Sequence, residues 1–203
     1  SGLEIIGTTE SIAEAIIIRT ALAILEEEGH TDVVVHINSV GDDDSRTRFE
    51  RELTHHFRAH INELSPREQK LLKENIYALM HAQGSELKQI KERAPETMEF
   101  LDEESRTHFM NVLEYLETLD IPYEIDGHLV TDSYFTHTAF EIRTRVEDPE
   151  EKGELLARGG RYMHVAPRTR FRDDIPSVTA SLSYKRAKTG SPKRFHLTRI
   201  DTP

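Results

Sequence analysis

Hydrophobic periodicity divides this chain into strand-like ends and a helical middle. The segments Asp32–Asn38 and Thr138–Arg143 show the β-branched composition and the two-residue alternation of strands. Between them, apolar residues recur at helical spacing over much of residues 42–120. This order predicts an α+β fold, in which residues 1–41 and 121–203 form parts of one mostly antiparallel sheet with flanking helices. Residues 42–120 are then a helical insertion.

Capping residues mark where several helices begin. Ser11 is followed by Glu14, the spacing of a capping box, and the predicted helix ends near Glu28-Gly29. Ser65-Pro66-Arg67-Glu68 is a stronger start, because Pro occupies a position whose N–H needs no partner. We expect that helix to run through Met80. Asp102 is expected to cap a further helix.

Two short segments could line a small-molecule pocket. Tyr134 and Phe135 directly precede the alternating run, which predicts a half-buried strand. Further along, Ala157–Tyr162 combines a glycine pair, which permits close backbone approach, with an arginine and a tyrosine. Packing aromatics and a hairpin turn explain the same residues equally well.

Composition narrows the class of protein. The 203 residues suffice for a substantial core, and the absence of cysteine excludes disulfides and thiolate zinc sites. The longest apolar runs are far shorter than a membrane span, and the first residues lack the pattern of a signal peptide. We therefore expect a soluble cytoplasmic protein without a membrane partner and without a structural metal.

The net charge of −11 hides an uneven distribution. Residues 151–203 carry 12 Lys and Arg against 5 Asp and Glu, so the remainder of the chain is strongly acidic. A basic C-terminal quarter could present a patch to phosphates or to tRNA. A solvated basic edge on an acidic protein is the alternative interpretation.

Many short motifs resemble, in order, those of histidyl-tRNA synthetases, which are class II aminoacyl-tRNA synthetases. The run Tyr134–Glu141 is similar to the first histidine-specific motif of that family, and Gly159–Tyr162 is similar to the second. Pro176–Arg186 falls where class II synthetases carry motif 3. The other matching segments are His36–Asp42, Ser45-Arg46, Phe49, Ala94-Pro95, Phe100-Leu101, Ser105–Phe109, Ile121–Tyr123 and Leu129-Val130.

The resemblance implies a class II synthetase fold, with histidine bound on the sheet and adenylated by ATP with Mg²⁺ before transfer to tRNA. It implies an ATP-binding role for Arg186 and, in the full-length protein, a homodimer. Discrimination of an imidazole requires placed hydrogen-bonding groups. The histidine-binding residues implied are Tyr134, Phe135, Thr138, Gly159, Gly160, Arg161, Tyr162 and Glu14.

The sequence also departs from the family pattern. Motifs 1 and 2 are missing from it, and Thr131 stands where the family carries an arginine that would stabilise charge during adenylation. Thr179 and Ser183 replace glycines of motif 3, and Glu14 is one residue out of register with the expected carboxylate. The catalytic residues therefore stay unassigned. Two alternatives remain open: a truncated or degenerate synthetase core that is not active alone, and a non-catalytic paralogue that senses histidine as a regulatory or scaffolding subunit.

Overall fold

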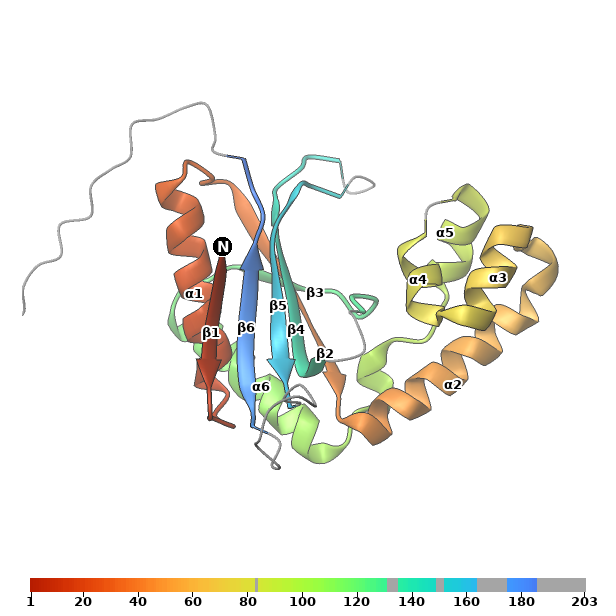
Figure 1. Ribbon diagram of the computed structural model, residues 1–203, viewed down its shortest axis with the longest axis horizontal. Helices are drawn as coiled ribbons and strands as arrows, with labels where there is room; N and C mark the ends of the chain where they lie inside the picture. Colours follow the sequence, from red (N-terminus) through yellow and green to blue (C-terminus); the bar gives the residue numbers. More distant parts are fainter. Residues whose placement is uncertain (83, 131–134, 149–151, 164–174, 186–203) are drawn as a thin grey trace, which may run out of the picture.

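The computed structural model describes residues 1–82, 84–130, 135–148, 152–163 and 175–185. In this part of the chain, one six-stranded sheet forms the centre of the molecule (Figure 1). Its strands are β1 (Gly2–Ile6), β2 (Val33–Gly41), β3 (Tyr123–Ile125), β4 (Phe135–Thr144), β5 (Leu155–Tyr162) and β6 (Ser177–Leu182).

The sheet has the strand order β1-β6-β5-β4-β2-β3. The pairs β1·β6, β5·β6, β4·β5 and β2·β4 are antiparallel, and the pair β2·β3 is parallel. The prediction of a mostly antiparallel sheet in an α+β protein is therefore confirmed. Because β1 pairs with β6, strands from the beginning of the sequence and from its last quarter lie side by side in one layer (Figure 1).

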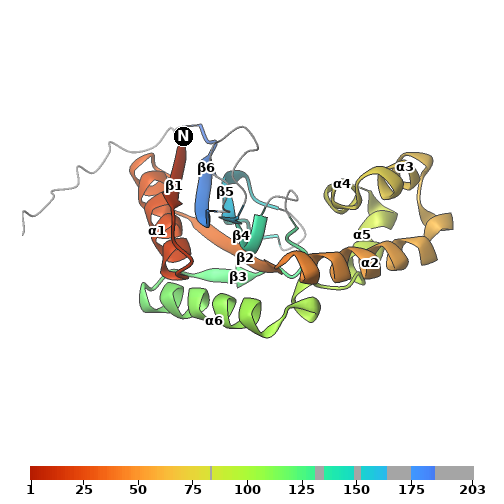
Figure 2. The same ribbon diagram turned by 60° about the horizontal axis from the view of Figure 1, so that its bottom comes forward.

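Helices α1 (Ile12–Glu27) and α6 (Glu103–Thr118) lie side by side on one face of the sheet (Figures 1 and 2). Apolar residues of both helices share a buried cluster with Val35, Phe140 and Ile142 of the central strands. The opposite face of the sheet carries no helix among the described residues (Figure 2). None of the described helices is long and apolar enough to cross a membrane.

The remaining helices form a unit of their own beside the sheet (Figures 1 and 2). We call residues 43–94 the helical unit; it contains α2 (Asp43–Ala59), η1 (Ile61–Glu63), α3 (Pro66–Glu74), α4 (Ile76–His81) and α5 (Ser85–Glu92). Its core is a second buried cluster, separate from that of the sheet. Helix η2 (Thr97–Phe100) then leads to α6, whose apolar residues belong to the sheet cluster. We propose that residues 43–94 are the insertion proper.

The single helix predicted from Ser65 through Met80 is wrong in one respect, because it is interrupted at Asn75. The backbone of Asn75 is extended, and its side chain accepts a hydrogen bond from the Ala78 amide, which starts α4 afresh. Asparagine favours such local hydrogen bonds over the helix interior. The predicted capping box of Ser65 and Glu68 is present, and Asp102 caps α6 as expected.

Strand β4 is buried more completely than its alternating sequence predicts. Ala139 and Glu141 belong to the face expected to meet solvent, yet they are 0% and 5% exposed. Arg143 and Arg158 both contact the Glu141 carboxylate, so a charged residue is accommodated on this face of a central strand. The half-buried interpretation is therefore wrong for the middle of β4.

Candidate functional site

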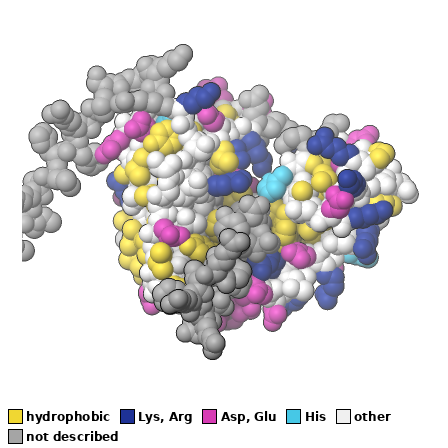
Figure 3. All heavy atoms as spheres, viewed as in Figure 1, with side chains coloured by type: hydrophobic (Ala, Val, Ile, Leu, Met, Phe, Trp, Pro, Cys, Tyr) yellow, Lys and Arg dark blue, Asp and Glu magenta, His cyan; other side chains and the backbone are white. Residues whose placement is uncertain are grey.

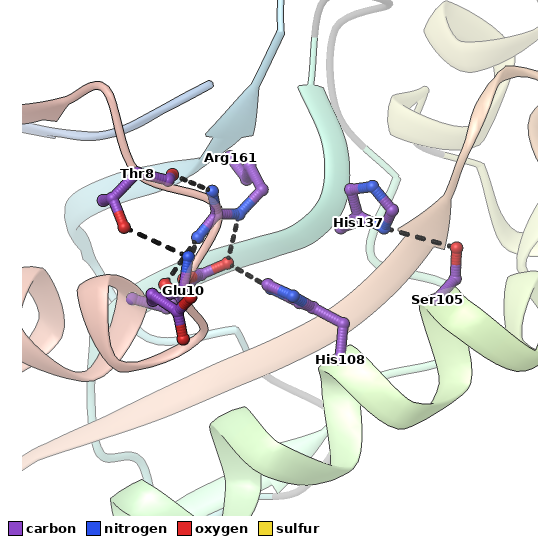
Figure 4. Close-up of polar contacts among 7 residues, drawn as sticks. Thr8, Glu10, Ser105, His108, His137 and Arg161 are labelled. Carbon is purple, nitrogen blue, oxygen red and sulfur yellow. Dashed lines mark hydrogen bonds and ion pairs between the residues drawn. The ribbon is translucent and has the colours of Figure 1, made fainter. Parts of the chain in front are cut away.

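The end of strand β5 is joined to helix α1 by a buried ion pair. Arg161 and Glu14 are 1% and 0% exposed. Arg161 donates from Nε to Glu14 Oε1 over 2.8 Å and from Nη2 to Glu14 Oε2 over 2.6 Å (Figure 4). Such a forked arginine–carboxylate pair fixes both the distance and the orientation of the two groups.

The same arginine holds the loop that precedes α1. Its Nη1 donates to the Thr8 carbonyl over 2.6 Å, and its Nη2 donates to the Glu10 carbonyl over 3.0 Å (Figure 4). These bonds connect β5, the loop of residues 7–11 and α1. A buried guanidinium requires this degree of satisfaction, because unpaired buried charge is costly.

Glu14 does not cap its own helix. Ser11, the N-cap of α1, makes no side-chain cap hydrogen bond, and Glu14 points instead to Arg161 and to His108 of α6. The capping box predicted from Ser11 and Glu14 is therefore wrong. His108 Nε2 lies 2.7 Å from Glu14 Oε1, so the carboxylate joins β5, α1 and α6. Its expected role toward a substrate amine stays a prediction.

Opposing influences act on the pKa of Glu14. Burial raises this pKa, but the hydrogen bonds from His108 and Arg161, together with their charges, outweigh burial and lower it below its ordinary value. The carboxylate is thus held in its ionised form, which is the form that both donors require.

A second histidine lies next to this network. The rings of His108 and His137 are 5.3 Å apart between centroids, and the Ser105 hydroxyl lies 3.3 Å from His137 Nδ1 (Figure 4). His137 has a φ of 54°, at a bulge where the β4–β5 register shifts. Burial, followed by the charges of His108 and Arg161, lowers the pKa of His137. A left-handed histidine at a bulge marks this end of β4 as a special position.

The glycine pair allows aromatic rings to pack closely on β5. A Cβ at Gly159 would lie 2.2 Å from the Thr179 carbonyl oxygen and 2.5 Å from Cζ of Phe140. A Cβ at Gly160 would lie 2.7 Å from Cδ1 of Phe135. Both glycines therefore serve packing within the protein, and their contact with a ligand stays a prediction.

Tyr162 lies on the other face of β5 from Arg161, because successive strand residues alternate. Its hydroxyl donates to a carboxylate oxygen of Glu4 on the edge strand β1. Its register partner on β4 is Phe135, and its partner on β6 is Ser177. Tyr162 thus presents a polar group on the face that carries no described helix, next to a buried phenylalanine.

The sequence is similar to bacterial histidine–tRNA ligases. It is 36% identical to the ligase of Streptococcus mutans over 163 residues, which cover 79% of this chain and 37% of the ligase. It is 31% identical to that of Bacillus licheniformis over 201 residues, or 94% of this chain and 47% of the ligase. No protein-family model matches the chain.

A solved structure shows the same arrangement of strands and helices. Apo S. aureus histidyl-tRNA synthetase matches 89% of this chain with a TM-score of 0.65 and 28% sequence identity, over 43% of its own length. The chain has a histidyl-tRNA synthetase-like, class II synthetase-related fold. This synthetase-like chain spans less than half the length of the two ligases.

The predicted histidine-binding residues of this synthetase-like chain lie in different surroundings. Arg161 and Glu14 meet on the face of the sheet that α1 and α6 cover. Phe135 and Tyr162 meet on the opposite face, which carries no described helix and which we call the open face. Thr138 is fully buried, and its hydroxyl has no hydrogen-bond partner among the described residues. Tyr134, Thr131 and the predicted ATP-binding Arg186 lie outside the described residues.

Sequence reasoning missed a cleft of about 340 Å³ farther along the open face. His36, Glu141 and Arg158 are cross-strand neighbours on β2, β4 and β5, and the first two line this cleft. Lys and Arg side chains are visible near the middle of this side of the molecule (Figure 3). The signal was present in the alternation of β4, which puts Glu141 and Arg143 on one face.

Proposed function

We propose that this chain is the histidine-binding part of a histidyl-tRNA synthetase-like protein and does not charge tRNA by itself. The two ligases named above act on histidine and tRNA by their names, and the chain resembles them over 79% and 94% of its length. The observation that carries the proposal is the position of Tyr162. Tyr162 belongs to the segment similar to the second histidine motif. Its hydroxyl and the Glu4 carboxylate form a polar pair, and Phe135 is its register partner on β4.

A tyrosine–carboxylate pair suits an imidazole ligand. While the Tyr162 hydroxyl donates its hydrogen to Glu4, its oxygen can accept a hydrogen bond from a ring N–H, and the carboxylate favours a protonated ring. On the opposite face of β5, the Arg161–Glu14 pair fixes the end of the strand that carries Tyr162. Supported residues of this kind keep a binding site in one geometry.

The absence of independent catalysis is proposed on two grounds. Thr131 replaces the arginine that would stabilise the developing charge during adenylation. Glu14 is fully buried and already accepts hydrogen bonds from Arg161 and His108. These features favour the alternative of a histidine-sensing regulatory or scaffolding subunit over a complete ligase.

The remaining assignments belong to the same proposal. The proposed binding of ATP with Mg²⁺ depends on Arg186, which lies outside the described residues. The charged group that contacts Tyr162 is the Glu4 carboxylate, whose negative charge does not suit a triphosphate. Binding of tRNA by the basic C-terminal quarter is proposed from the charge of that segment. A homodimeric full-length protein and a cytoplasmic location are proposed from the family resemblance. Titration of the chain with histidine tests the proposed pocket. A tRNA-retention measurement tests the basic quarter, because retention through it should fall steeply as the salt concentration rises.

A further inference from the structure

Phe135 connects the proposed histidine pocket to the helical unit. It is the first residue of β4, it is 4% exposed, and its ring fills the space above Gly160. Its register partner across the β4–β5 ladder is Tyr162. A displacement of Phe135 would therefore change the surroundings of Tyr162, the residue that the proposed function places against the imidazole.

Arg46 of the helical unit holds the backbone of Phe135. Its Nη1 donates to the Phe135 carbonyl oxygen over 3.0 Å, although the two residues are 89 positions apart. Its Nη2 contacts Asp43, one turn earlier on α2, and the arginine side chain is 18% exposed. The ion pair with Asp43 orients the guanidinium, so that the donor to Phe135 is held in place by α2 itself.

The first turn of α2, which carries Arg46, is capped and directly follows β2. The Asp42 side chain accepts a hydrogen bond from the Ser45 amide over 2.8 Å, which caps the helix. Gly41, with a φ of 69°, leads β2 into this cap, and a Cβ there would lie 2.5 Å from Cβ of Ser45. Arg46 therefore projects from a capped first turn that follows β2 directly.

Side chains fill the joint between the helical unit and β4. Phe135, Arg46, Phe49 and Tyr77 border a void of only about 10 Å³, which is near the lower limit for a single water molecule. Such a closely packed joint transmits displacement instead of absorbing it. On the other side of β4, His137 contacts Ser105 of α6, so this end of the strand is held from both directions.

We propose that Arg46 is a positioning residue that couples the orientation of the helical unit to the histidine pocket. This inference rests on the proposed function, since it names the control of that same site. A partner that binds the helical unit and shifts α2 changes the position of the Phe135 carbonyl and, through Phe135, the surroundings of Tyr162. By thermodynamic linkage, histidine in the pocket then changes the affinity of the helical unit for that partner by the same factor.

The first test needs no ligand. Arg46→Ala is compared with Arg48→Ala, because Arg48 lies two residues away on α2 and donates to a different carbonyl, that of Phe100, over 2.9 Å. Hydrogen–deuterium exchange of the amides in residues 135–139 and 160–162 should be about threefold to tenfold faster in Arg46→Ala and unchanged in Arg48→Ala. Equal exchange in both variants overturns the coupling. If Arg46→Ala does not fold, Arg46→Lys, which keeps the charge but loses the fork, takes its place.

The second test uses histidine and chemical rescue. Arg46→Ala should bind histidine about tenfold more weakly than the unchanged chain, and free guanidinium at low millimolar concentration should restore part of that affinity. Arg48→Ala should show neither the loss nor the rescue. A loss that guanidinium does not restore assigns Arg46 a merely structural role. If the unchanged chain binds no histidine, the proposed function fails, whereas the exchange measurement still decides whether Arg46 couples the two parts.

Discussion

Arg161 and Glu14 are 147 residues apart in the sequence and meet in a doubly hydrogen-bonded ion pair on the helix-covered face of the sheet. The pair fastens strand β5, which carries Tyr162, to helix α1, and His108 adds helix α6 to the same carboxylate. Buried ion pairs of this kind seldom add much net stability, but removal of one partner leaves an uncompensated charge. We expect the pair to favour one arrangement of β5, α1 and α6 around the proposed pocket.

Removal of the Glu14 charge tests whether the ion pair holds β5 against α1. Glu14→Gln leaves Arg161 buried without a counter-ion, and we expect a loss of about 3–5 kcal/mol in the free energy of unfolding, measured with urea. Glu10→Gln is the matched control, because Glu10 is exposed and contacts Arg161 through its backbone carbonyl alone among the described contacts. Equal losses in both variants would show that the ion pair is not the connection between β5 and α1.

Acid should release the same connection. The pKa of Glu14 is lowered in the folded protein, because the donors from His108 and Arg161 outweigh burial, so the unfolded chain binds a proton more readily. The stability that Glu14 contributes is present above its ordinary pKa of 4.5 and is lost as the pH falls through the lower, folded value. Urea unfolding between pH 6 and 3 should show this slope, and Glu14→Gln should flatten it.

His137 should add a separate pH dependence at higher pH. Burial and the neighbouring charges of His108 and Arg161 lower its pKa, while Glu104 and Glu14 act in the opposite direction. The folded state thus disfavours the protonated ring, and stability should decrease as the pH falls through the ordinary histidine value of 6.5.

Two variants isolate this contribution. His137→Asn should reduce the slope of stability between about pH 7 and 5, because asparagine tolerates the left-handed backbone and does not titrate there. His55→Asn, at an exposed position of α2, is the matched control for the loss of a histidine. A slope that survives His137→Asn in full would assign the pH dependence to other histidines.

Gly159 should resist even the smallest substitution. In Gly159→Ala, the new methyl group would meet the Thr179 carbonyl and the Phe140 ring at distances that no Cβ tolerates, and we expect a loss of about 1–3 kcal/mol or more. Gly2→Ala is the control, since its nearest neighbour is the Ala180 carbonyl at 3.8 Å. Thermal unfolding compares the two variants, and similar midpoints would contradict the packing role.

Tyr162 should matter for ligand binding more than for stability. Tyr162→Phe removes the hydroxyl that contacts Glu4 and should weaken histidine binding about tenfold, since a lost hydrogen bond to a charged or polar ligand group costs about 1–2 kcal/mol. Tyr115→Phe, on the partly exposed surface of α6, provides a matched control. Unchanged histidine affinity in Tyr162→Phe would remove this tyrosine from the site.

Local signals in the sequence predicted much of the fold. The capping box of Ser65 and Glu68 and the cap at Asp102 were recognisable because each depends on residues within one turn. The two-residue alternation located β4, but it could not reveal that Arg143 and Arg158 allow Glu141 to be buried. Burial of that face is decided by neighbouring strands far apart in the sequence.

The candidate site was harder to predict for the same reason. Ser11 and Glu14 have the spacing of a capping box, and nothing local distinguishes that pattern from a carboxylate that reaches Arg161 and His108 on other elements. The contact between Arg46 and Phe135 joins two segments whose pairing is set by how the helical unit packs on the sheet. Family resemblance identified these residues as relevant, and the tertiary structure supplied their partners.

Calorimetric titration of the chain, first with histidine and then with ATP, decides whether the proposed histidine pocket exists. We expect saturable binding of histidine, weakened by Tyr162→Phe, and little response to ATP from a chain that is not catalytic by itself. Absence of any histidine binding by a folded chain would contradict the proposed pocket and leave only the synthetase-like fold.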